Sequence, residues 1–106
     1  MYKISIAKDF SETPGARYKD DGPFSGEEFR EIFLEPLFEN PDDNKDIIVI
    51  LDGVEGYATS FLDEAFGGIA RKYGVKRCLK RFKFISKDVK LYVNEIISYI
   101  KKTNEK

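Results

Sequence analysis

The chain has 106 residues, enough for one domain, and 42% of them are hydrophobic. It has no histidine and a single cysteine, which excludes histidine-dependent nucleophilic catalysis, histidine-ligated metals and an internal disulfide. The longest apolar run, Ile47–Leu51, is far shorter than the roughly 20 residues of a membrane helix, and the first ten residues do not resemble a signal peptide. We therefore expect one cytoplasmic domain over residues 1–106, not an enzyme, with no metal or cofactor.

The net charge of −1 conceals two parts of opposite sign. Residues 1–70 have a net charge of −10, and residues 71–106 have a net charge of +9. Such a split favours a two-faced surface that binds an acidic partner, nucleic acid or a second copy of the chain. A homodimer is therefore one expectation.

Alternation of apolar and polar residues predicts the first strand. Tyr2, Ile4 and Ile6 alternate with more polar neighbours, which is the period of a half-buried strand. Residues 11–23 are rich in turn formers, and a short strand at Ala16–Lys19 is predicted to pair back onto the first strand.

The first long helix has a clear start. Ser25 is the predicted N-cap, Glu28 closes a capping box, and Phe24 and Phe29 are spaced as a hydrophobic staple. Pro36 should kink or end the regular helix near residue 34, because proline lacks a backbone donor.

A continuous β-branched run at Ile47–Leu51 predicts a central strand that is buried on both faces. A second helix is predicted over residues 60–73, with Thr59 or Ser60 as N-cap and a Ser60–Asp63 capping box. Two adjacent glycines in the middle of this helix indicate that another part of the fold packs closely against it.

Residues 80–85 read as a further strand, and Ser86 or Asp88 as the cap of a last helix that extends to Ile100. The predicted order is β-β-α-β-α-β-α. Alternation of this kind predicts the α/β class, here a small mixed four-stranded sheet with helices packed on it.

The turn at residues 52–60 is the candidate site, because ligands of α/β sheets gather where strands end and helices begin. A nucleotide loop is disfavoured, since Ala58 stands where the phosphate-binding motif needs lysine. A role for Asp52 as a phosphoacceptor is disfavoured, because the sequence lacks the acidic pair and the lysine of a receiver domain. A calcium site is disfavoured as well, because the spacing of the acidic residues matches no calcium-binding loop. Thr59 and Ser60 can be plain helix caps or sites at which a phosphate changes docking.

The basic stretch at residues 71–83 carries seven Lys or Arg in 13 residues and no acid. It can bind nucleic acid through phosphates, or it can be a solvated helix end, loop and edge strand. Cys78 in this positive stretch is either a reactive thiol or a bystander.

The segments IIVILDGVEGYATSFLDEAFGGIARKYG and DGPFSGEEFRE resemble STAS domains, the fold of anti-sigma-factor antagonists, and more narrowly a bacterial STAS-like family of unknown function. The resemblance implies a four-stranded mixed sheet. It also implies a non-enzymatic regulatory domain that docks a GHKL-type, histidine-kinase-like ATPase and is controlled by phosphorylation at the start of the second helix.

Residue by residue, the phosphorylated serine of the STAS motif corresponds to Ser60, and its neighbour corresponds to Thr59. The aspartate and glycine of the motif are Ala58 and Phe61 here. The alternative hypothesis is a nucleic-acid-associated module that uses residues 71–83. The expected docking surface, beside the two hydroxyl residues, is Gly53, Glu55, Gly56, Tyr57, Asp63 and Glu64.

Overall fold

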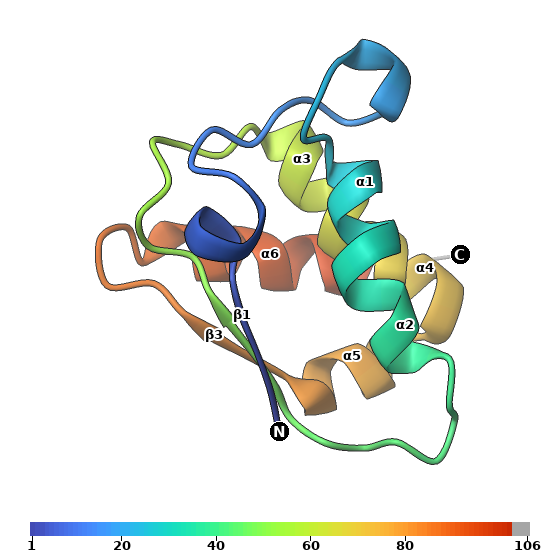
Figure 1. Cartoon of the computed structure of the whole chain (residues 1–106). Coiled ribbons are helices and arrows are strands. Elements are labelled where there is room, and N and C mark those ends of the chain that lie inside the picture. The colour runs from blue at the N-terminus through green and yellow to red at the C-terminus, as the bar shows by residue number, and fades with distance from the viewer. Residues whose placement is uncertain (103–106) are drawn as a thin grey trace.

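The computed structural model describes residues 1–102 and contains a parallel three-stranded sheet (Figure 1). Strand β2 (Ile47–Ile50) lies between β1 (Tyr2–Ser5) and β3 (Phe82–Ile85), and both neighbours run parallel to it. The prediction of a central strand at 47–51 is therefore confirmed, and so is the α/β class.

The predicted fourth strand at Ala16–Lys19 is absent from the described residues, so the sheet is not of the mixed four-stranded kind. The carbonyl groups of Ala16 and Arg17 accept hydrogen bonds from Gly26 and Glu27 at the start of the next helix. The segment is thus joined to the start of α1, and it forms no ladder with β1. The first strand is also shorter than predicted, because Ile6 begins the π-helical turn η1 (Ile6–Phe10).

Two long helical segments change hydrogen-bonding pattern along their length. The first comprises α1 (Gly26–Phe29), the π-helical η3 (Arg30–Leu34) and α2 (Glu35–Phe38). The second comprises α3 (Thr59–Leu62), the π-helical η4 (Asp63–Gly67) and α4 (Gly68–Tyr73). The remaining helices are the 3-10 turn η2 (Lys19–Asp21), α5 (Val75–Arg81) and α6 (Leu91–Lys102). None of the described helices is long and apolar enough to cross a bilayer.

The predicted start of the first helix is largely correct. The Ser25 hydroxyl accepts a hydrogen bond from the Glu28 amide at 3.0 Å, as an N-cap does. The Glu28 carboxylate accepts from the Phe24 amide instead of the Ser25 amide, so the capping box is only half formed. Near Pro36 the regular pattern is broken by η3, but the helix continues to Phe38.

The helices cover one face of the sheet and leave the other face open (Figure 1). On the covered face, Ile4, Val49 and Phe82 are buried among the helices. The core contains aromatic residues from both long helical segments, among them Phe29, Phe61 and Phe66. Helix α6 packs on η4, where Ile96 and Ile100 are fully buried.

Candidate functional site

The turn after β2 is held at its beginning to the turn that precedes α6. The Asp52 carboxylate accepts hydrogen bonds from the backbone amides of Lys87 and Asp88, at 2.8 to 3.0 Å. These bonds hold the pKa of Asp52 below its ordinary value. Asp52 thus fixes the turn that precedes α6, and α6 begins at Leu91, not after a Ser86 or Asp88 cap as predicted.

The middle of the turn is held by Tyr57. Its hydroxyl donates to the Leu51 carbonyl at 2.8 Å, and its ring meets the Tyr92 ring edge-on at 4.9 Å between centroids. Burial raises the pKa of Tyr57, so the phenol stays protonated and keeps this bond. The Glu55 amide donates to the Glu12 carbonyl, whereas the side chain of Glu55 and Gly56 are exposed.

Gly53 lies at the start of the turn with a φ of +91°, a conformation that other residues rarely adopt. It is exposed, and a Cβ there would lie 3.1 Å from the Ala7 side chain. The turn is therefore a pre-formed, solvent-facing loop.

Thr59 and Ser60 lie at the start of α3, which begins one residue before the predicted start at residue 60, but neither of them caps the helix. The N-cap is Ala58, whose carbonyl accepts from the amides of Phe61 and Leu62. Because the helix begins one residue earlier than a Thr59 cap requires and two residues earlier than a Ser60 cap requires, both hydroxyls lie past the capping position. Thr59 is exposed and Ser60 is half-buried, and neither hydroxyl bonds to any part of the chain that the structure describes.

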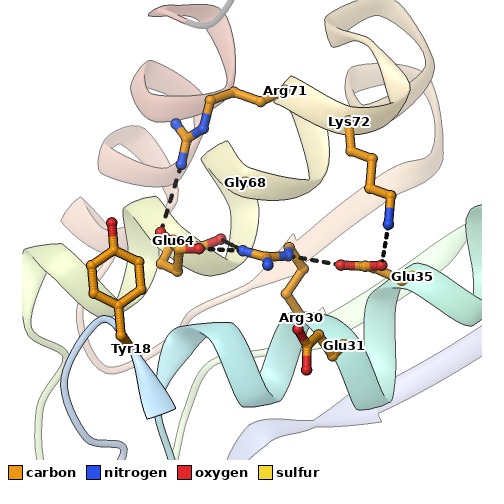
Figure 2. Close-up of a pocket in the computed structure, with 8 residues that line it drawn as sticks. All are labelled: Tyr18, Arg30, Glu31, Glu35, Glu64, Gly68, Arg71 and Lys72. Atoms are coloured by element: carbon orange, nitrogen blue, oxygen red, sulfur yellow. Dashed lines mark hydrogen bonds and ion pairs between the residues drawn. The ribbon is translucent and has the colours of Figure 1, made fainter. Parts of the chain in front are cut away.

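Asp63 and Glu64 belong to a cluster of charged side chains, much of which Figure 2 shows. The Asp63 carboxylate pairs with Arg17 at 2.8 Å, in place of the predicted capping box. Glu64 is buried and pairs with Arg30, and Arg30 also binds Glu35 at 2.9 Å. Lys72 reaches Glu35 at 2.6 Å, and Arg71 lies 3.4 Å from Asp63. The cluster borders a cleft of about 510 Å³.

The two mid-helix glycines make room for this cluster. A Cβ at Gly68 would lie 2.7 Å from the Arg30 guanidinium, and one at Gly67 would lie 2.6 Å from the Asp63 carboxylate. Close packing by another part of the fold is thus confirmed at Gly68, where the neighbour is Arg30 of the first helical segment. At Gly67 the nearest side chains belong to the same helical segment, and the Tyr99 carbonyl oxygen of α6 would lie 3.5 Å from a Cβ. The structure brings Gly53, Glu55, Gly56, Tyr57, Thr59 and Ser60 together in the turn, but it engages Asp63 and Glu64 in ion pairs.

We expect the cluster to make stability fall in acid. Burial raises the pKa of Asp63 and of Glu35, but hydrogen bonds and charges from Arg17 and Arg71, and from Lys72 and Arg30, outweigh it and leave both pKa values below ordinary. Carboxyls of this kind stabilise the fold fully above their unfolded pKa of about 4, and the stabilisation is lost as pH falls through the lower folded pKa.

The melting temperature should therefore drop between roughly pH 5 and pH 2, and less steeply in Asp63→Asn or Glu35→Gln. Thermal melts at several pH values measure this. An unchanged acid slope in both variants would show that the pairs contribute nothing.

The basic stretch 71–83 is mostly occupied within the fold. Residues 75–81 form α5, not the loop and strand predicted there. The Arg77 guanidinium donates to the carbonyls of Phe38, Asn40 and Asp43, and buried Arg81 donates to those of Leu37 and Lys45. With Arg71 and Lys72 paired to acids, the unpaired cations of the stretch are the amines of Lys76, Lys80 and Lys83, of which the last donates to a backbone carbonyl.

This arrangement leaves only three lysines of the stretch to contact the phosphates of a nucleic acid. We expect a salt slope of log affinity against log salt no steeper than about −3, the value for three phosphate contacts. Random duplex should compete as well as any defined sequence. A titration at several salt concentrations measures the slope, and a much steeper slope or a preferred sequence would favour the nucleic-acid hypothesis.

Cys78 takes no part in the polar side-chain contacts of the basic stretch. It is fully buried, and burial raises the pKa of its thiol to about 12, so it is a core residue and not a reactive thiol. Among residues 1–102, no three acidic or cysteine side chains gather as a metal site would require.

One comparison with known proteins gives a match. A family model described as a STAS-like domain of unknown function (DUF4325) matches residues 25–90, from the Ser25 cap to the turn that Asp52 holds. No curated protein and no solved structure matches the chain. The matched residues include the whole candidate turn and both long helical segments.

Proposed function

Because the chain belongs to this family of STAS-like domains of unknown function, we propose that it is a non-enzymatic regulatory domain that docks a GHKL-type ATPase. The docking surface is the turn at residues 53–60. Phosphorylation of Ser60 or Thr59 controls the docking, as the resemblance to STAS antagonists implies.

One observation carries the proposal: neither the Thr59 hydroxyl nor the Ser60 hydroxyl caps helix α3. Thr59 is exposed on a turn that Asp52 and Tyr57 hold in place. A phosphate there would meet the positive end of a helix that needs neither hydroxyl for its own stability. Modification can therefore alter the surface without unfolding the domain. The ion-paired Asp63 and Glu64 support the surface from within.

We expect Thr59→Asp to weaken docking without loss of stability. A carboxylate in the first turn of the helix stabilises it by about 0.3–1 kcal/mol, and no cap is removed. Ser60→Ala should change the free energy of unfolding by less than about 0.5 kcal/mol for the same reason. Thermal melting measures both.

Docking is measured by affinity purification of tagged chains from the source cells, with quantitative mass spectrometry. Wild type should enrich a GHKL-type ATPase, and Thr59→Asp and Ser60→Asp should recover it at least about tenfold less, which is about 1.4 kcal/mol. Ser98→Asp, on the exposed side of α6, is the matched control. Equal recovery with Thr59→Asp and Ser60→Asp, or the absence of such an ATPase from the wild-type sample, would contradict the proposal.

A further inference from the structure

The open face of the sheet is unusual for a parallel sheet, because parallel sheets are normally covered on both faces. Its centre is apolar, with Ile48 and Ile50 half-buried on β2 and Ile85 exposed beside them on β3. Lys3 and Lys83 flank Ile48 in the register, one on each edge strand. The three strands contain no acidic residue. The face is thus an apolar strip between lysines.

A hollow of about 580 Å³ extends this face at the carboxyl ends of β1 and β2. Ile50 and Ala7 line it together with the cations of Lys3 and Lys8. Three acids also line it, Asp9, Glu12 and Asp52; Asp9 accepts from the Ser5 amide, and Asp52 accepts from the amides of residues 87 and 88. The hollow therefore suits an apolar side chain, and the cations that can meet acids of a partner are Lys3 and Lys83, which flank Ile48 on the strands.

The helical segment 26–39 of the same chain has the complementary surface. It contains five glutamates and one arginine. Ile32 is 55% exposed there, and Pro36, four residues further, is exposed as well. Glu28 and Glu39 lie at the two ends of this stripe, at helical spacing. Glu31 pairs with Lys19, and Glu35 pairs with Arg30 and Lys72, whereas Glu28 and Glu39 form no ion pair within the described residues. The outer face of the segment is therefore an exposed apolar ridge with an unpaired acid at each end.

We propose that the open sheet face binds the acidic outer face of helical segment 26–39 of a second copy, so that copies associate head to tail. The sizes agree: the stripe from Glu28 to Glu39 is about 17 Å long, and four-residue strands are about 13 Å long. A helix about 10 Å wide spans three strands about 4.8 Å apart. The contact gives the parallel sheet its second helical layer and places Ile32 toward the hollow.

The contact is small, so association should be weak. One helix on one sheet face is at the low end of specific interfaces, and we expect a dissociation constant in about the micromolar range. Because charges flank the apolar strip, raising the salt should weaken it. Gly53 of the turn at 53–60 also lines the hollow, but the three strands and helical segment 26–39 lie outside that turn, so the association does not depend on the proposed docking.

The test is sedimentation equilibrium of the wild-type chain and two variants. Lys3→Glu/Lys8→Glu reverses the charge beside the sheet face. Ile32→Lys removes the apolar ridge on helical segment 26–39. All three residues are exposed, so the fold should persist. Each variant alone should weaken association at least about tenfold. Mixed, they should form a 1:1 complex, since each retains one intact surface. Lys76→Glu/Lys101→Glu, with the same change of charge elsewhere, should associate as wild type does.

A wild-type chain that stays monomeric at about 1 mM in low salt would overturn the proposal, because it excludes micromolar association. A mixture of the two variants that forms no complex would also overturn the proposal. In a head-to-tail contact each variant keeps one intact surface, so the absence of a complex would mean that the copies associate in another arrangement, such as a symmetric dimer. Full association by each variant alone would show that other surfaces mediate the contact.

Discussion

Replacing Arg81 by methionine should lower the free energy of unfolding by about 3 kcal/mol or more. Arg81 is fully buried, and its guanidinium donates to the carbonyls of Lys45 at 2.8 Å and Leu37 at 2.5 Å. It also lies 3.4 Å from the Asp43 carboxylate and over the Phe38 ring. Its loss leaves the carbonyls of Leu37 and Lys45 and the Asp43 carboxylate without the guanidinium that they bind, and methionine can replace only the packing.

Chemical denaturation of Arg81→Met measures this loss, with Lys80→Met on the exposed side of α5 as the control. The control should change stability by less than about 0.5 kcal/mol. A loss below about 1 kcal/mol in Arg81→Met would mean that Asp43, which also accepts from the Tyr2 hydroxyl, and the two carbonyls find other partners.

Gly26→Ala should destabilise the domain by about 1–3 kcal/mol, although alanine is the better helix former. A Cβ at residue 26 would lie 2.6 Å from the Phe61 carbonyl oxygen and 3.2 Å from the Phe61 Cα. These are backbone atoms of α3, so the two helical segments would have to move apart. The movement would loosen the packing of Phe29 against Phe61 in the core.

Gly56→Ala is the matched control, because the nearest atom to its Cβ would be the Tyr92 hydroxyl at 4.0 Å. It should be neutral or slightly stabilising. Melting of both variants under one condition compares them. Equal stability of Gly26→Ala and wild type would mean that α1 and α3 are not in the close contact described here.

The parts of the fold that depend on neighbouring residues were predictable from the sequence. The apolar run at 47–51 indicated a central strand, and the spacing around Ser25 indicated an N-cap; both are confirmed. The strand at Ala16–Lys19 was wrong because its carbonyls serve the start of α1, a choice that depends on where two distant segments meet. A parallel sheet of non-local pairs leaves little local signal.

The candidate site was predictable in position but not in detail. The turn lies where β2 ends and α3 begins, as expected for an α/β sheet. The capping role of Ser60 was wrong because the helix starts two residues earlier than a Ser60 cap requires, which moves the hydroxyl past the cap position. The ion pairs of Asp63 and Glu64 with Arg17 and Arg30 join residues 34 to 47 positions apart, so no helical or strand period indicates them. The local traces of this cluster were the adjacent glycines and Arg71, which lies two helical turns after Asp63 and Glu64.

Hydrogen exchange of the chain, alone and with the GHKL-type ATPase recovered from the source cells, tests the docking turn most directly. The account predicts slower exchange at the amides of residues 53–60 when the ATPase is bound, with α5 and the rest of 71–83 unchanged. It also predicts that the effect disappears in Thr59→Asp. Slower exchange over residues 75–83, with the amides of 53–60 unchanged, would contradict the assignment of the turn as the docking surface.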